Sequence, residues 1–291
     1  MPDPKCKIFQ STYLGDEKDN DWTNMWRTIE AGKQPFKYID RLQIAFANIM
    51  ADDPDKSYLQ YSYPDRAQQT IKAAKTQNPN IEIIAQMGWA SGLLPLFSDR
   101  SKTRERLDTF ASSITEFIKE YDLHGIDFDW EFGGAVASNV TTDDATFLFE
   151  RTRYYLDKAN RPVMTITPDG ETPQGQYLDV AVLNKLFNTV IPQSYGRVKY
   201  IDNYINAGIL PSKLCCGICS ERDGQWWPNG VVSADIKQYT DKVDQYKLSG
   251  LYSWRVDNDD ADADTNLLKY TITTSMWTYS RGVAPQPPLY P

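Results

Sequence analysis

Short apolar runs alternate with longer amphipathic runs about eight times along the chain, and this alternation limits the folds available to it. Eight apolar runs are expected to be strands: 7–10, 42–49, 81–88, 125–130, 162–167, 189–194, 213–218 and 250–254. The clearest helical runs are 103–121, 144–159 and 233–247, with a last one at 263–277. Repeated strand–helix units in 291 residues predict a closed parallel sheet, an α/β fold of the (β/α)8 TIM-barrel type.

A doubly wound open sheet is the alternative arrangement of such units. It is disfavoured because no glycine-rich nucleotide loop follows any predicted strand. No linker divides the chain, so residues 1–291 are expected to form a single barrel domain. In such barrels the chemistry lies at the carboxyl ends of the strands. Those positions are Trp89, Glu131, Asp169, Tyr195, Glu221 and Trp254.

Charge and hydropathy exclude several classes of partner. The net charge of −8 argues against nucleic acid, whose phosphates require a basic surface. No apolar stretch is long enough to span a bilayer, and the first residues lack the apolar segment of a signal peptide. The chain is therefore expected to bind neither nucleic acid nor membrane. Its 8 Trp and 18 Tyr suit a sugar-binding cleft, although many of these rings belong to the core.

Cysteine and histidine usage narrows the possible chemistry further. Cys216 and Cys219 have CxxC spacing beside Cys215, but no second ligand pair or histidine accompanies them, so buried thiols are favoured over a metal or redox role. His124 is the only histidine, so a catalytic triad or a multi-histidine zinc site would depend on it alone. Acid–base chemistry is therefore expected to use carboxylates.

The run Gly125-Ile126-Asp127-Phe128-Asp129-Trp130-Glu131 carries three acids on one strand. Successive strand residues point to opposite faces, so the acids share one face and the apolar residues share the other. If the apolar set packs against helices, the acids point into the barrel, about 7 Å apart. A solvated acidic face would place the apolar side chains inside, and calcium ligands usually come from loops. Acids this close together in a confined interior resist ionisation, so the pattern indicates a functional site that uses them.

At these residues the chain resembles family 18 glycoside hydrolases, the chitinases and endo-β-N-acetylglucosaminidases. GIDFDWE reproduces the second half of their DxxDxDxE motif. LQIAFANI resembles the family's second strand, VIPQSYG is similar to its Gln-x-Tyr strand end, and GLYSWRVDND is similar to its eighth-strand end with a tryptophan.

The chain also departs from the family pattern. His124 replaces the first aspartate of the motif, and Ala85 and Met87 replace residues of the third-strand Ser-x-Gly-Gly segment. Gly196 follows Tyr195 where Asp or Asn is usual, which puts substrate preference in doubt.

The resemblance implies a retaining mechanism in which the substrate's own acetamido group is the nucleophile. Glu131 would protonate the glycosidic oxygen, Asp129 would orient the acetamido nitrogen, Asp127 would share a proton with Asp129, and Tyr195 would contact the acetamido oxygen. The substrate-binding candidates implied by the same likeness are Trp254, Gln193, Trp89, Trp226 and Trp227.

The partner implied is chitin or another N-acetylglucosamine-containing oligosaccharide, bound by a monomer without metal or organic cofactor. Such a function favours a secreted protein, although the chain shows no signal peptide. Two alternatives remain open: an endo-acting enzyme on N-glycans, and a chitinase-like protein that binds without cleaving. Relatives of the second kind usually lack the acid that Glu131 supplies here.

His124 is expected to stay outside the reaction. It precedes Glu131 by seven residues, which is roughly 23 Å on an extended strand at about 3.3 Å per residue. It should therefore lie near the opposite rim of the barrel, where it could give Asp127 a hydrogen bond or a counter-charge.

Overall fold

The computed structural model describes residues 4–15, 20–132, 139–220, 233–260 and 265–285. Within these ranges, eight strands run parallel in the order β7-β6-β5-β4-β2-β1-β9-β8. They are β1 (Lys7–Tyr13), β2 (Arg41–Met50), β4 (Glu82–Met87), β5 (Gly125–Trp130), β6 (Val163–Pro168), β7 (Thr189–Val190), β8 (Cys215–Cys219) and β9 (Gly250–Trp254). An isolated parallel bridge between Val190 and Leu214 brings the two ends of this order together. The fold is a TIM-type (β/α)8 barrel, as the alternation predicts.

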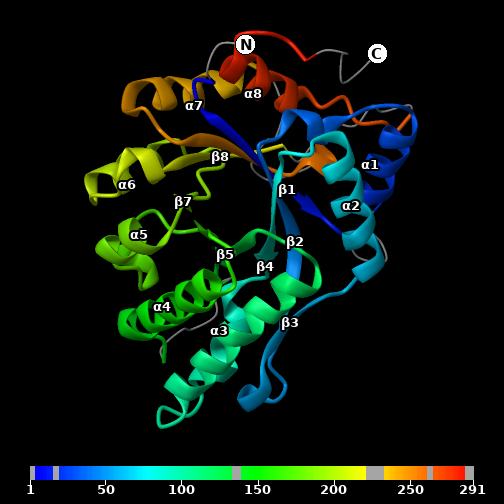
Figure 1. Ribbon diagram of the computed structural model, residues 1–291. Coiled ribbons are helices and arrows are strands. Elements are labelled where there is room, and N and C mark those ends of the chain that lie inside the picture. Colours follow the sequence, from blue (N-terminus) through cyan, green and yellow to red (C-terminus); the bar gives the residue numbers. More distant parts are fainter. Residues whose placement is uncertain (1–3, 16–19, 133–138, 221–232, 261–264, 286–291) are drawn as a thin grey trace.

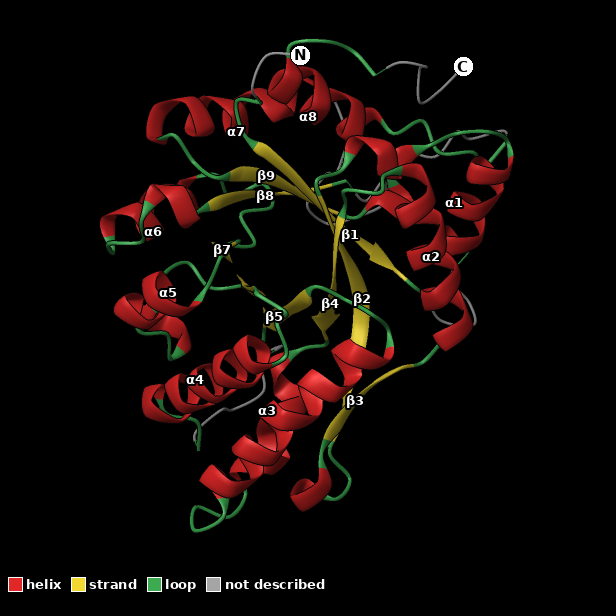
Figure 2. Cartoon of the chain, viewed as in Figure 1, coloured by secondary structure: helices red, strands yellow, loops and turns green. Residues whose placement is uncertain are grey.

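The helices surround the strands, which occupy the centre of the molecule (Figures 1 and 2). They are α1 (Asp21–Glu30), α2 (Pro64–Gln77), α3 (Thr103–Glu120), α4 (Thr142–Lys158), α5 (Val180–Leu186), α6 (Lys199–Asn206), α7 (Ser233–Tyr246) and α8 (Thr271–Arg281). No helix of the described ranges is long and apolar enough to cross a membrane.

The seam between β7 and β8 is held partly by a side chain. The sequence predicts a strand over 189–194, but β7 ends at Val190. Pro192 has no backbone N–H to donate to a neighbouring strand, which explains why β7 ends before the predicted limit. Beyond Val190 the Ser194 side chain replaces the backbone ladder: its Oγ donates to the Gly217 carbonyl over 2.9 Å and accepts from the Gly217 N–H over 3.0 Å. A Cβ at Gly217 would lie 2.5 Å from the Pro192 oxygen, so the two segments approach too closely for a side chain.

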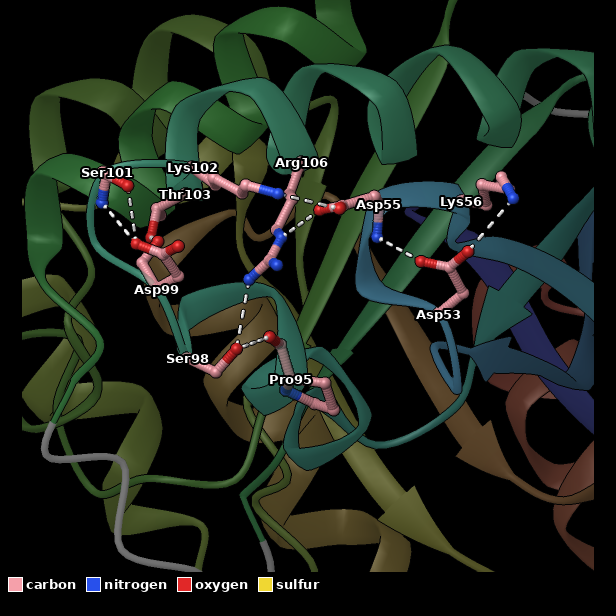
Figure 3. A network of polar contacts seen from close by, with 10 residues as sticks. All are labelled: Asp53, Asp55, Lys56, Pro95, Ser98, Asp99, Ser101, Lys102, Thr103 and Arg106. Carbon is pink, nitrogen blue, oxygen red and sulfur yellow. Dashed lines mark hydrogen bonds and ion pairs between the residues drawn. The ribbon is translucent and has the colours of Figure 1, made fainter.

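A hairpin that sequence analysis does not predict extends from the barrel. Strand β3 (Tyr58–Tyr61) pairs antiparallel with the end of β2, and the short 3₁₀ helix η2 (Pro54–Lys56) lies between them. Asp55 of η2 accepts from Arg106 Nε over 2.6 Å and from Lys102 Nζ over 3.1 Å. Arg106 Nη1 also donates to Ser98, which follows the 3₁₀ helix η3 (Ala90–Phe97) (Figure 3). These bonds join the hairpin to α3 and η3.

The predicted helix at 263–277 is displaced, because α8 begins only at Thr271. Tyr270, the residue before it, has a left-handed backbone with φ of 57°. The helix start is capped from a distance: the Asp259 carboxylate accepts from the N–H groups of Ile272 and Thr273 over 2.9 and 2.8 Å. The capping side chain lies twelve residues before Thr271, the first residue of the helix, and so leaves no local signal in the sequence.

The outer face of β5 packs as the alternation predicts. Phe128 and Trp130 are fully buried, and their rings lie 5.2 and 5.0 Å from the ring of Phe149 in α4. At the start of β5, Gly125 approaches β6 so closely that a Cβ there would lie 1.7 Å from the Val163 oxygen. The cysteines of the chain are buried free thiols, as expected: Cys6, Cys215, Cys216 and Cys219.

Candidate active site

The inner face of β5 carries the acid row. Asp127 and Asp129 are 0% and 3% exposed, and Glu131 follows the last residue of the strand. In the parallel register with β6, Asp127 pairs with Thr165 and Asp129 pairs with Thr167. The row therefore leads from the barrel interior to the carboxyl ends of the strands, where Glu131 lines an open cavity.

Three side chains hold Asp127. Thr165 Oγ1 donates to its Oδ1 over 2.5 Å, Thr167 Oγ1 to its Oδ2 over 2.9 Å, and Gln86 Nε2 to the same Oδ2 over 3.1 Å. Burial raises the pKa of Asp127 to about 6, and these hydrogen bonds oppose the rise. The donors therefore favour an ionised Asp127 near neutral pH.

Asp129 has different surroundings. Burial raises its pKa well above the usual value, and the charges of Glu131, Asp127 and Asp169 raise it further. Gln193 Nε2 donates to Asp129 Oδ1 over 3.1 Å and to Glu131 Oε2 over 3.2 Å, so one amide joins the two acids. The arrangement favours a protonated Asp129 beside an ionised Asp127.

A fourth acid, Asp169, lies beyond Asp127 and Asp129, towards the carboxyl ends of the strands. Asp169 follows β6, where Pro168 pairs with Trp130, so it occupies the position beside Glu131. Burial, and next the charge of Glu131, raise the pKa of Asp169 to about 6.

The cavity beside Glu131 has a volume of about 220 Å³. Its wall combines acids, amides and aromatic rings: Phe46, Gln86, Trp89, Asp129, Glu131, Thr167, Gln193, Tyr195 and Trp254. Tyr195 is 8% exposed, and burial raises the pKa of its hydroxyl well above the usual value, so it is a hydrogen-bond donor at neutral pH. Trp89 stands at the rim with 54% of its surface exposed.

The rings of Phe46 and Trp254 form one side of the cavity, and Tyr13 packs against both of them; the three residues are here called the aromatic floor. The Phe46 and Trp254 ring centroids lie 5.4 Å apart at an angle of 23°. Tyr13 lies 5.8 Å from Phe46 and 6.4 Å from Trp254. Cis peptide bonds join Ala45 to Phe46 and Trp254 to Arg255. A flat apolar surface of this kind suits the face of a pyranose ring.

Most site residues expected from the sequence come together here. Asp129, Glu131, Gln193, Tyr195, Trp89 and Trp254 line the cavity, and Asp127 lies beneath Asp129. Trp226, Trp227 and Glu221 lie outside the described residues. Sequence analysis missed Phe46, Gln86 and Thr167, although each stands near the carboxyl end of a predicted strand, which is the signal that could have found them.

His124 lies at the amino end of β5, as expected, but does not support Asp127 directly. Its Nδ1 accepts from the backbone N–H of Ile83 over 2.9 Å. The hydrogen bonds to Asp127, one of which His124 could have supplied, come from Thr165, Thr167 and Gln86. The described residues contain no cluster of three or more His, Cys, Asp or Glu side chains that could hold a metal ion.

Comparison with known proteins agrees with this geometry. The model of Glycosyl hydrolases family 18 matches residues 13–218, from Tyr13 at the end of β1 to Ile218 in β8. The chain belongs to glycosyl hydrolase family 18.

Relatives within family 18 include chitinases. Chitinase A1 from Niallia circulans is 32% identical over 98 residues, which are 31% of this chain and 13% of that protein. Chitinase ChiA74 from Bacillus thuringiensis has a similar fold, with a TM-score of 0.72 at 13% identity over 97% of this chain and 70% of that one. Human YKL-39, described as a pseudo-chitinase with retained chitooligosaccharide binding, has a TM-score of 0.66 at 15% identity over 93% of this chain and 98% of that one. The family thus holds both enzymes and binding proteins.

Proposed function

We propose that the protein hydrolyses β-1,4-linked N-acetylglucosamine polymers, chitin or chitooligosaccharides, by a substrate-assisted retaining mechanism. The observation that carries the proposal is Glu131 at the cavity, joined through Gln193 to the buried Asp129. A binding protein would need neither an acid at the opening nor the costly burial of two further acids behind it.

In the first step Glu131 gives its proton to the glycosidic oxygen as the bond to the anomeric carbon breaks. The acetamido oxygen of the same sugar attacks that carbon and forms a cyclic oxazolinium ion. Asp129 orients the acetamido N–H, and the ionised Asp127 behind it balances the developing positive charge. Tyr195 donates its hydroxyl to the acetamido oxygen.

In the second step Glu131, now a carboxylate, takes a proton from water, and the water oxygen opens the oxazolinium ring. Two inversions at the anomeric carbon leave the product in the β configuration. The aromatic floor supports the reacting sugar, and Trp89 at the rim provides a stacking platform for a neighbouring one.

The deciding experiment compares the wild-type chain with Glu131→Gln on chitin oligomers and on a high-mannose glycoprotein, with products identified by mass. We expect cleaved oligomers whose new reducing end is first β by NMR. Glu131→Gln should fold normally and lose at least about a thousandfold in rate, because general-acid help is typically worth 10²–10⁴.

Other results would select another function. Cleavage of the glycoprotein alone would identify an endo-acting enzyme on N-glycans. Binding of oligomers without cleavage by the wild type would identify a pseudo-enzyme, and an α product would exclude the substrate-assisted route.

A further inference from the structure

A buried ion pair lies behind the aromatic floor, outside the cavity. Arg255 is 6% exposed and follows Trp254 at the end of β9. Its Nη1 donates to Asp257 Oδ2 over 2.7 Å, and its Nη2 donates to the carboxylate of Asp21, the first residue of α1. Asp257 has no exposed surface. A buried guanidinium held by two carboxylates has little freedom to move, because its planar donors fix the geometry of both contacts.

The same ion pair touches the floor at several points. The guanidinium carbon of Arg255 lies 4.9 Å from the centre of the Tyr13 ring and 6.0 Å from that of Trp254. Asp257 Oδ1 accepts the backbone N–H of Tyr13 over 2.8 Å. The pair therefore ties the end of β1, which carries Tyr13, to the end of β9, which carries Trp254.

We propose that Arg255 and Asp257 are positioning residues for the reaction: they hold Tyr13 and Trp254 in the orientation in which the floor receives the sugar that is cleaved. Neither residue lines the cavity, so their proposed effect on this sugar is exerted through Tyr13 and Trp254. The inference rests on the proposed function, since that function assigns the floor to the sugar.

The chain offers a matched control in Asp259. It is 1% exposed and stands two residues after Asp257, so both carboxyl groups are equally buried in one segment. Asp259, however, accepts from Ile272 and Thr273 at the start of α8. Replacing either aspartate by asparagine removes a buried charge, but only Asp257→Asn breaks the link between Arg255 and the floor.

The test uses the full chain carrying Glu131→Gln, which binds oligomer without turnover. Affinity for a tetramer of N-acetylglucosamine is measured by calorimetry, and the Trp254 indole resonance is followed by NMR, assigned with Trp254→Phe. Asp257→Asn should raise the Kd at least about tenfold and shift this resonance, while Asp259→Asn lowers the melting temperature and leaves both unchanged. Without Glu131→Gln, Asp257→Asn should raise KM with kcat within about threefold.

Arg255→Lys is the second variant if Asp257→Asn does not fold. Lysine keeps the charge but cannot bridge two carboxylates while lying over Tyr13, so the same rise in Kd is expected. Equal effects of Asp257→Asn and Asp259→Asn, or an unmoved Trp254 resonance in Asp257→Asn and Arg255→Lys, would overturn the proposal. If the parent binds no tetramer and the wild type cleaves none, the proposed function fails, and the indole resonance alone still decides whether the pair positions Trp254.

Discussion

Asp127 and Asp129 stand two residues apart on one strand, and their neighbours give them different charges. Asp127 receives hydrogen bonds from Thr165, Thr167 and Gln86, whereas Asp129 faces other acids and the Gln193 amide. A donor to a carboxylate favours its charged form, and a neighbouring negative charge opposes it. The hydroxyl groups of β6 therefore help decide where the proton of the pair resides.

Replacing Thr165 by valine tests this directly. Thr165→Val keeps the shape but removes the 2.5 Å donor to Asp127, so the pKa of Asp127 should rise above its present value of about 6. If the reaction needs ionised Asp127, the acid limb of the kcat profile moves to higher pH, and kcat at pH 6 falls roughly tenfold, a barrier change of about 1.4 kcal/mol.

The control is Thr165→Ser, which restores the hydroxyl and should restore the wild-type profile. An unchanged pH profile in Thr165→Val would show that this threonine does not influence the acid pair.

His124 should matter for stability and not for the reaction. Its Nδ1 accepts the Ile83 N–H over 2.9 Å at the amino end of β5. His124→Asn should therefore lower the free energy of unfolding by about 1–2 kcal/mol, the value of one such bond. Its rate should stay within roughly tenfold of wild type. Activity and melting measured beside Glu131→Gln decide the matter: a folded His124→Asn variant as inactive as Glu131→Gln would give the histidine a part in the chemistry.

The acid row is predictable from sequence because its period of two lies within one strand. The partners of the row are not. Thr165 and Thr167 bind Asp127 from β6, and Phe46 lines the cavity from β2; only the register between strands reveals which side chains meet. A position near the carboxyl end of a strand narrows the choice, but isolated polar or aromatic residues in apolar strands are too common for that signal alone to identify these three.

Among the elements, the β2–β3 hairpin and η3 share one anchor. Arg106 of α3 binds Asp55 in the hairpin and Ser98 after η3 (Figure 3). Trp89 immediately precedes η3, and Phe46 lies on β2. The anchor therefore supports two segments of the cavity wall from outside.

Arg106→Ala and Lys102→Ala make a matched pair, since both residues bind Asp55. The Arg106 side chain is 10% exposed and that of Lys102 is 49% exposed, so solvent screens the lysine contact more strongly. Arg106→Ala should lower the melting temperature by at least about 2 °C and speed proteolysis within 50–60, with Lys102→Ala close to wild type. Equal melting temperatures for the two variants would contradict this role of Arg106.

Local periodicity in the sequence predicts which helices and strands exist better than it predicts where each of them ends. The predicted strands, including 42–49 and 162–167, and the helices α3, α4 and α7 are found within a few residues of their expected limits. The last helix and β7 differ because Asp259 caps α8 from a separate segment and Pro192 stops β7. The hairpin strand β3 is too short to show a period.

At the scale of the whole molecule, buried acids should set the pH dependence of stability. Burial raises the pKa of Asp127 and of Asp259 from 3.8 to about 6. Between pH 4 and 6 these two acids hold more protons in the folded chain than in the unfolded chain, so the free energy of unfolding should fall as pH rises through this window.

Surface carboxylates act in the opposite direction and over a lower range. Hydrogen bonds from Lys75 and Arg161 lower the pKa of Asp122, and those from Arg106 and Lys102 lower that of Asp55. These ionised carboxylates stabilise the folded chain above pH 3.8, the ordinary pKa of aspartate, and this stabilisation is lost as the pH falls below that value. Melting followed from pH 3 to 8 should therefore peak at about pH 4–5. A melting temperature that rises between pH 5 and 7 would show that the buried acids do not dominate.

The seam between β7 and β8 gives the barrel one weak line. Other neighbouring strands of the barrel share ladders of backbone hydrogen bonds, whereas among the described residues β7 and β8 are joined by one bridge and the Ser194 hydroxyl. Local opening starts where the fewest backbone bonds must break. Amide hydrogen exchange should therefore be faster for the Gly217 N–H than for the amides of β1, β2 and β5. This seam lies beside Gln193 and Tyr195 of the cavity wall. Local opening there would move the edge of the cavity and leave the strand that carries the acid row intact.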